Sequence, residues 1–228
     1  MTLPKFLVLC IDHGDIEILH QTLQKSWPTH HQSVNITTIH ENLRKLSPET
    51  YKFDLMVSPA NSYGIMDGGF DDAISRSFCL PHHDYRALTN VAQQKLYEQW
   101  RGFAPPGTCT LVSLPSELRE TNRWGCKYLA ICPTMRTPGD ARWDREVVYE
   151  CVWSLMCEVD RWNRNVDRDH GDESTIDTIL ITPLATGTGG FVLALKHFVD
   201  ALERPDRWSR LKWEDLQEVK KVQKTWQT

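Results

Sequence analysis

Two stretches of the chain combine glycines with polar side chains directly after apolar segments. The first is Ser58-Pro-Ala-Asn-Ser-Tyr-Gly-Ile-Met-Asp-Gly-Gly-Phe-Asp-Asp-Ala-Ile74 and the second is Ala185-Thr-Gly-Thr-Gly-Gly-Phe191. Glycine-rich backbone approaches a ligand closely, and free N–H groups at a helix N-terminus bind phosphate. Asn61 supplies an amide that both donates and accepts hydrogen bonds, and Asp71 supplies a carboxylate that can take a proton. Each stretch alone is equally consistent with a tight turn, but together they predict a site for a phosphate-containing ligand.

Neither glycine stretch has a usual nucleotide-binding signature. The Walker pattern requires Lys followed by Ser or Thr after the last glycine, whereas Phe191-Val192 follows Gly190 here. The dinucleotide pattern requires G-x-G-x-x-G in a first strand-helix-strand unit, and the sequence has none there. A P-loop NTPase and a nicotinamide dehydrogenase are therefore disfavoured.

The elements around these stretches predict a single three-layer α/β domain. Apolar, β-branched runs predict the strands. The run 6–11 is expected to be buried on both faces, and 108–114 and 128–132 have buried-strand patterns that fit inner strands. Charged residues predict an exposed loop over 163–174 and a last helix over 208–226, within an extension spanning 204–228. The expected strands are 6–11, 34–39, 53–57, 108–114, 128–132 and 176–181, and apolar periodicity predicts helices around 16–23, 144–162 and 193–202.

Composition and charge narrow the classes of function. The 228 residues are 40% hydrophobic and 25% charged, with a formal net charge of -4, so there is no overall positive field for a nucleic-acid backbone. The apolar run 6–11 is too short for a signal-peptide core or a membrane span, and a cytoplasmic or nuclear location is expected. The 7 cysteines include no C-x-x-C pair and are expected to be reduced, mostly buried thiols.

Both glycine stretches resemble the macro domain family, in which a V-N-A-A-N-like motif precedes a Gly-rich stretch and V-D-x-A-I, and an S-T-G-x-x-G-aromatic loop follows later. The matching residues are Val57-Ser-Pro-Ala-Asn61, Gly68-Gly-Phe-Asp71-Asp-Ala-Ile74 and Ala185-Thr-Gly-Thr-Gly-Gly-Phe191. The chain looks most like a fungal branch with a Ser-Pro-x-Asn-Ser-Tyr-Gly signature and an extra first strand. The resemblance spans about residues 5–203. It implies an α/β/α sandwich with a mixed central sheet and a cleft for ADP-ribose.

The resemblance also implies roles for individual residues. Asn61 would hydrogen-bond the distal ribose, and Asp71 would position or deprotonate a water beside the anomeric carbon. The alternatives are that Asn61 supports a turn, that Asp71 faces a helix dipole, and that Phe191 packs in the core rather than beside adenine. Asn61 and Asp71 are thus the expected catalytic residues, and the expected ligand-binding residues are Glu41, Ala60, Gly68, Gly69, Phe70, Thr186, Gly187, Thr188, Gly189, Gly190 and Phe191.

Some positions depart from the family pattern. Ser58 replaces the first Asn, Pro59 removes a backbone donor, and Gly189 stands where many members have an aromatic residue. The acidic residue that meets adenine usually lies near a G-D-I-T motif, but Gly14-Asp15-Ile16 comes one strand too early. By register, Glu41 is the expected adenine-side acid, with a solvated helix-start acid as the alternative.

Three functions remain open within this resemblance. A hydrolase acting at the 1″ position is favoured, either an ADP-ribose 1″-phosphate phosphatase, which is preferred, or an ADP-ribosyl-protein hydrolase. A non-catalytic reader of ADP-ribose on a protein partner is the rival, but a reader does not need the carboxylate of Asp71. His82-His83-Asp84 has no Cys or His partner at ligand spacing, so no metal or other cofactor is expected. Further candidate bases are His13, His40 and His197.

Overall fold

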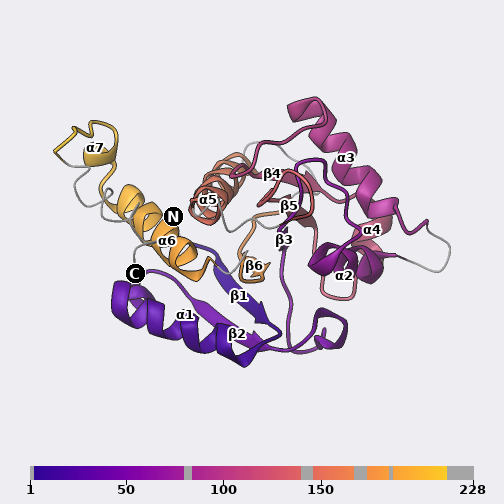
Figure 1. Ribbon diagram of the computed structural model, residues 1–228, viewed down its shortest axis with the longest axis horizontal. Helices are drawn as coiled ribbons and strands as arrows, with labels where there is room; N and C mark the ends of the chain where they lie inside the picture. The colour runs from indigo at the N-terminus through magenta and orange to yellow at the C-terminus, as the bar shows by residue number, and fades with distance from the viewer. Residues whose placement is uncertain (1–2, 80–83, 140–145, 167–173, 185–186, 215–228) are drawn as a thin grey trace.

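The centre of the protein is a six-stranded mixed sheet (Figure 1) with strand order β2-β1-β6-β3-β5-β4. The computed structural model describes residues 3–79, 84–139, 146–166, 174–184 and 187–214. Every neighbouring pair is parallel except β4 and β5, which are antiparallel. The strands are β1 (Lys5–Cys10), β2 (Ile36–His40), β3 (Leu55–Ser58), β4 (Thr110–Ser113), β5 (Tyr128–Ile131) and β6 (Thr178–Ile181).

Helices cover both faces of the sheet. One layer contains α1 (His13–Ser26), α5 (Val147–Val166) and α6 (Thr188–Glu203), and the other contains α2 (Gly69–Phe78), α3 (Ala87–Trp100) and α4 (Ser116–Thr121). Figure 1 shows α2, α3 and α4 gathered on one side, while α7 (Pro205–Trp208) projects beyond the end of α6. Short 3-10 turns occupy His30–Gln32 and Leu43–Lys45. The predicted three-layer α/β/α sandwich with a mixed sheet is confirmed.

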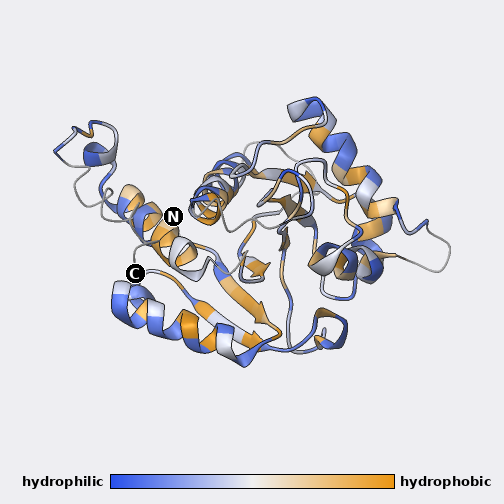
Figure 2. Cartoon of the chain, in the orientation of Figure 1, coloured by the Kyte–Doolittle hydropathy of each residue, from blue (hydrophilic) through white to orange (hydrophobic). Residues whose placement is uncertain are grey.

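Burial on both faces explains why the strands are apolar without alternation. In β3, Leu55 and Val57 belong to the core beneath α5 and α6, Met56 belongs to the core beneath α2 and α3, and all three are 0% exposed. In Figure 2 the strands are mostly hydrophobic, whereas the helices are hydrophobic on one side and hydrophilic on the other. The predicted strands therefore exist, each within a few residues of its expected bounds, although the two edge strands β2 and β4 are only partly buried.

The position of β4 contradicts the expectation that 108–114 forms an inner strand. β5 is an inner strand, but β4 lies at the edge of the sheet and pairs with β5 alone. Thr110 and Val112 are buried while Leu111 and Ser113 are partly exposed. Helices α3 and α5 both pack near β4. Coverage by these helices, rather than a central position, accounts for its apolar residues.

Helix ends differ from expectation at two places. α5 continues to Val166, so the loop predicted from residue 163 begins later, because Asn163 is tied to the chain entering β6. Its Nδ2 donates to the carbonyl of Ile176 at 3.0 Å, and its Oδ1 accepts from the N–H of Ile176 at 2.8 Å. At the other place, α7 ends at Trp208, where a charged helix was expected to begin, and 209–214 are not helical. The remainder of that expected helix, 215–228, lies outside the described residues.

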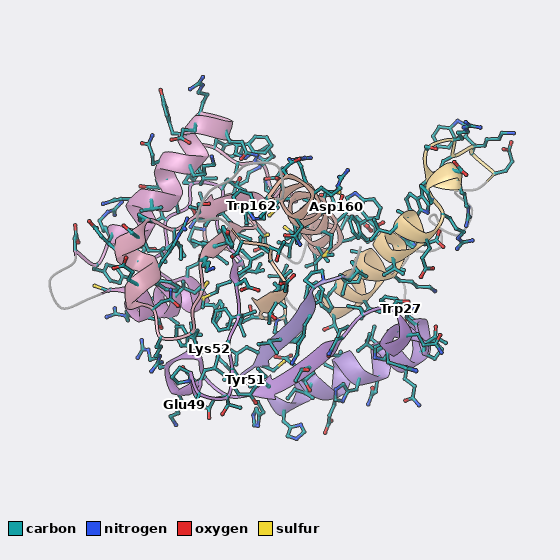
Figure 3. The ribbon with its side chains drawn as sticks, turned by 180° about the vertical axis from the view of Figure 1, so that it is seen from behind. Trp27, Glu49, Tyr51, Lys52, Asp160 and Trp162 are labelled. Atoms are coloured by element: carbon teal, nitrogen blue, oxygen red, sulfur yellow. The ribbon has the colours of Figure 1, made fainter. Side chains whose placement is uncertain are left out.

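α1 and α6 lie side by side on one face of the sheet, and Trp27 lies where the end of α1 meets α6 (Figure 3). Trp27 is buried, and Lys196 of α6 donates to the carbonyl of Ser26 at 3.0 Å. This packing joins the C-terminal end of α1 to α6. None of the described helices is long and apolar enough to cross a membrane.

The cysteines behave as expected from sequence. All 7 lie in the described part of the chain, none forms a disulfide, and all but Cys79 and Cys157 are buried. Burial raises the pKa of Cys10 to about 11 and that of Cys126 to about 12. These two thiols therefore stay protonated at neutral pH and are poor nucleophiles.

Candidate functional site

A cleft of about 510 Å³ opens at the carboxyl ends of β1, β3, β5 and β6. Ligands bind at this edge in parallel α/β sheets because the loops there converge. Asn61 and Asp71, the two expected catalytic residues, both line it, as do Gly68, Gly69 and Phe70. The full lining is Leu9, Ile11, Asp15, Pro59, Asn61, Ile65, Asp67, Gly68, Gly69, Phe70, Asp71, Thr134, Met135, Pro138, Gly139, Thr182 and Pro183.

The N-terminus of α2 presents open backbone to this cleft. Gly68 is the N-cap, no side chain caps the helix, and Gly69 has φ 56°, a left-handed conformation that glycine adopts without steric cost. A Cβ built at Gly68 or Gly69 would meet nothing within 4 Å, so packing does not account for the absence of side chains there. The first N–H groups of α2 are thus placed to bind an anionic ligand.

Asn61 has the turn-supporting role that was the alternative to ligand binding. Its Oδ1 accepts from the N–H of Tyr63 at 3.1 Å and of Ile65 at 3.3 Å, and its Nδ2 donates to the carbonyl of Ile65 at 2.7 Å. The amide nitrogen carries two hydrogens, and only one has an acceptor among the described residues. Because Asn61 also lines the cleft, its second N–H is the group that can reach a ligand.

Asp71 is a buried carboxylate in the wall of the cleft. It is 6% exposed, and the Ser58 hydroxyl donates to its Oδ1 at 2.6 Å. Burial, with a smaller contribution from the charge of Asp67, raises its pKa from 3.8 to about 6, against the opposing effect of the Ser58 hydrogen bond. Asp71 belongs to the first turn of α2, which agrees with the alternative that it faces the helix dipole. A pKa of about 6 also suits acid–base chemistry near neutral pH.

The neighbouring Asp72 shows how strongly position decides the properties of these two acids. Its carboxylate accepts from Arg76 at 2.8 Å and from the Tyr85 hydroxyl at 2.5 Å, and Arg44 lies 3.7 Å away. These partners hold the pKa of Asp72 below its usual value. Asp72 therefore has a structural role, while Asp71 faces the cleft.

The described lining of the cleft is acidic. Asp15, Asp67 and Asp71 contribute carboxylates, and no Lys, Arg or His is present among the lining residues of the described chain. An anionic ligand would therefore depend on backbone N–H groups rather than on side-chain cations. The negative charge of these carboxylates also disfavours an anionic group of a ligand close to Asp71.

The second glycine stretch lies beside the cleft rather than in its described lining. Thr182 and Pro183 line the cleft and also a small adjoining cavity, which Thr188 and Phe191 line as well. α6 begins at Thr188 without a side-chain cap, so its first N–H groups are also open to an anion. Thr186 lies outside the described residues.

Packing accounts for two of the three glycines in this stretch. A Cβ at Gly187 would lie 2.4 Å from a methyl carbon of Val148, and one at Gly190 would lie 3.0 Å from the backbone nitrogen of Tyr149. A Cβ at Gly189 would meet nothing within 4 Å. Gly187 and Gly190 therefore allow α6 to approach α5, and only Gly189 can be replaced without a clash.

Several expected site residues lie elsewhere. Ala60 is 0% exposed in the core, and its N–H and carbonyl pair with Cys132 and Thr134. Phe191 is 7% exposed and packs edge-to-face on Phe6 with ring centroids 5.7 Å apart, which is the core position. Glu41 is not among the lining residues, and its side chain accepts from the N–H of Asn42 at 2.8 Å.

Asp15 lines the cleft, whereas Glu41, the acid expected there by register, is not among its lining residues. β2, which precedes Glu41, is the outermost strand, whereas β1 lies next to β6 near the centre of the sheet. The turn after β1 consequently reaches the cleft, and the turn after β2 does not. The Gly14-Asp15-Ile16 tripeptide marks this acid in the sequence, but only the strand order shows that it reaches the cleft.

The loop after β5 was not expected to contribute and supplies Thr134, Met135, Pro138 and Gly139. It runs alongside the first glycine stretch, with a bridge between Asn61 and Met135. Thr134 is 2% exposed, and its Oγ1 is the one buried side-chain polar atom without a hydrogen-bond partner among the described residues. The position of this loop at the end of a buried strand was the only available sequence signal.

The candidate histidines do not join the site. His13 and His40 pack against each other with ring centroids 5.3 Å apart, and His197 contacts the Tyr149 hydroxyl at 3.0 Å. None of them lines the cleft. His82 and His83 lie outside the described residues. Within the described ranges, no three His, Cys, Asp or Glu side chains are grouped so that they could hold a metal ion.

No protein-family model matches the sequence. Among solved structures, the chain is similar to a variant of the Oceanobacillus iheyensis macrodomain with ADPR, at 10% identity and a TM-score of 0.40, covering 68% of this chain and 91% of that one. The same macrodomain with ADP is similar at 11% identity and a TM-score of 0.39, with 68% and 89% covered. With MES bound, it is similar at 12% identity and a TM-score of 0.39, with the same coverage.

Proposed function

We propose that this protein is a macro-domain hydrolase that binds ADP-ribose in the cleft and cleaves a bond at its 1″ position. The observation that carries the proposal is the buried carboxylate of Asp71, in one cleft wall with Asn61 and the uncapped N-terminus of α2. This arrangement combines an anion site with an acid–base group. The motifs around 57–74 and 185–191 support the family assignment, including its fungal branch.

Binding would rest on the backbone rather than on cationic side chains. The free N–H groups at the start of α2 would hold the pyrophosphate from one side, and those at the start of α6 from the other. The second N–H of the Asn61 amide would bind a distal ribose hydroxyl. Asp15 replaces Glu41 as the proposed adenine-side acid because it lines the cleft.

In the proposed reaction, ionised Asp71 accepts a proton from a water molecule as the water oxygen attacks the anomeric carbon. The bond from that carbon to the leaving-group oxygen breaks, and the leaving group departs with the electron pair. A pKa of about 6 leaves Asp71 mostly ionised at neutral pH, while it remains basic enough to take the proton.

Two leaving groups fit this chemistry. The fungal signature favours phosphate, which makes ADP-ribose 1″-phosphate the first candidate substrate. The acidic lining favours the second, an ADP-ribosylated protein side chain, because a phosphate monoester would bring about -1.5 to -2 charge toward Asp67 and Asp71. A non-catalytic reader would not need Asp67 or Asp71 beside the anomeric carbon.

The test is to incubate the pure protein with ADP-ribose 1″-phosphate and, separately, with ADP-ribosylated protein, and to measure released phosphate and released ADP-ribose. We expect turnover of at least one substrate. Phosphate release would support the first candidate, and faster release of ADP-ribose from protein would support the second. Binding of ADP-ribose with no turnover of either substrate would contradict the hydrolase and support a reader.

A further inference from the structure

The Ser58 hydroxyl contacts the carboxylate of Asp71. Ser58 is the last residue of β3 and is 0% exposed. Its hydroxyl has one hydrogen, which it donates to Oδ1 of Asp71 at 2.6 Å. The bond joins the end of a central strand to the first turn of α2, so two rigid elements set the position of the carboxylate.

The Ser58 bond leaves the two oxygens of Asp71 in different states. Oδ1 accepts from Ser58, while Oδ2 has no hydrogen-bond partner among the described residues. Asp71 also lines the cleft, so Oδ2 is the oxygen that remains for water or ligand. A carboxylate fixed through one oxygen and free at the other has the geometry required of a general base.

The charged groups around Asp71 increase the importance of this single donor. Asp67 from the preceding loop and Asp15 from α1 share the cleft lining, and both are acidic. The nearby cations Arg44 and Arg76 are engaged with Asp72 instead. Ser58 is the one described side chain that favours the ionised form of Asp71.

We propose that Ser58 is a positioning residue, whose hydroxyl holds Oδ1 of Asp71 so that Oδ2 faces the cleft as the general base. This inference rests on the proposed hydrolase function. It assigns a role to one of the positions at which the sequence departs from the family pattern, where Ser replaces the first Asn. It also explains why the buried Ser58 hydroxyl donates to a carboxylate and not to a backbone carbonyl.

The test is the pH dependence of kcat for Ser58→Ala, measured on whichever 1″-linked substrate the wild type turns over. A hydrogen bond to the charged form of an acid lowers its pKa. Loss of the Ser58 donor should therefore raise the pKa of Asp71, and with it the midpoint of the acidic limb, by about one pH unit. The rate should therefore fall by about tenfold below that limb and by less at alkaline pH. ADP-ribose affinity should stay within a few-fold.

Ser75→Ala is the matched control. Ser75 is a buried serine of α2 at 1% exposed, and its hydroxyl donates to the carbonyl of Met66 at 2.7 Å instead of to Asp71. Its replacement should cost comparable stability and leave the acidic limb in place. Ser58→Thr, which retains a hydroxyl, should restore the limb toward the wild-type position.

Titration of Asp71 by carboxyl carbon NMR measures the same shift without depending on turnover. Wild-type turnover with an unmoved kinetic limb and an unmoved Asp71 titration in folded Ser58→Ala would overturn the positioning role alone. Absence of turnover in the wild type on every 1″-linked substrate would instead overturn the proposed function, and the catalytic role of Ser58 with it.

Discussion

Replacing Asp71 with Asn is expected to lower turnover of a 1″-linked ADP-ribose substrate by about 10²–10⁴-fold, the usual loss on removal of a general base. ADP-ribose affinity should stay within a few-fold or improve, because the carboxylate contributes little attraction to an anionic ligand. A group required only in the transition state lowers kcat without weakening ground-state binding. Steady-state kinetics combined with calorimetric binding will separate these quantities.

Two further variants make this result specific. Asp72→Asn removes the neighbouring acid, which contacts Arg76 and Tyr85 rather than the cleft, and should leave turnover nearly unchanged. Asn61→Ala should weaken both binding and turnover, because its amide lines the cleft and organises the turn. If Asp71→Asn retains wild-type turnover while folded, Asp71 is not the base.

The same Asp71→Asn variant is expected to be more stable than the wild type above pH 6. The folded-state pKa of Asp71 lies near 6 and the ordinary value is 3.8, so folding favours the protonated, neutral form. In the wild type, the stabilisation from protonated Asp71 is complete below pH 3.8 and is lost as the pH rises through 6. The shift corresponds to an upper limit of about 3 kcal/mol at pH 8.

Urea unfolding of both proteins at pH 8 and at pH 4.5 measures this difference. Asn stays neutral at both values and can accept the Ser58 hydrogen bond, so its advantage should be large at pH 8 and reduced to about a third of that at pH 4.5. Asp72→Asn should instead lose stability at both pH values, because the partners of Asp72 lower the pKa of its carboxylate and that stabilising contribution is present above pH 3.8. Equal free energies of unfolding for wild type and Asp71→Asn at pH 8 would show that burial of the ionised Asp71 carboxylate does not destabilise the folded protein.

The sequence was sufficient for the layers of the fold but not for every element. Continuous apolar runs predicted the strands because burial on both faces leaves no alternation, as in β3. The same runs could not distinguish an inner strand from the edge strand β4, because helices cover that edge too. α3 gives a weak periodic signal, since its buried residues are only Leu88, Thr89, Ala92 and Leu96.

The candidate site was predictable where it follows from local sequence and not where it depends on sheet order. Asn61, Asp71 and the glycines at 68–69 lie in one continuous stretch, and they reach the same cleft. Asp15 could be preferred to Glu41 only once β1 was known to lie inside β2. The packing roles of Gly187 and Gly190 likewise depend on α5, which is distant in sequence.

Calorimetric titration with ADP-ribose measures whether the cleft binds this ligand. The wild type should bind ADP-ribose with micromolar affinity, on the order of -8 kcal/mol, and should bind ATP much more weakly. Gly189→Glu should abolish binding without unfolding, since a Cβ at this position meets nothing within 4 Å, while the Glu carboxylate brings a negative charge toward the proposed phosphate site. Absence of ADP-ribose binding by the folded wild type, or equal affinity for ATP, would contradict the account.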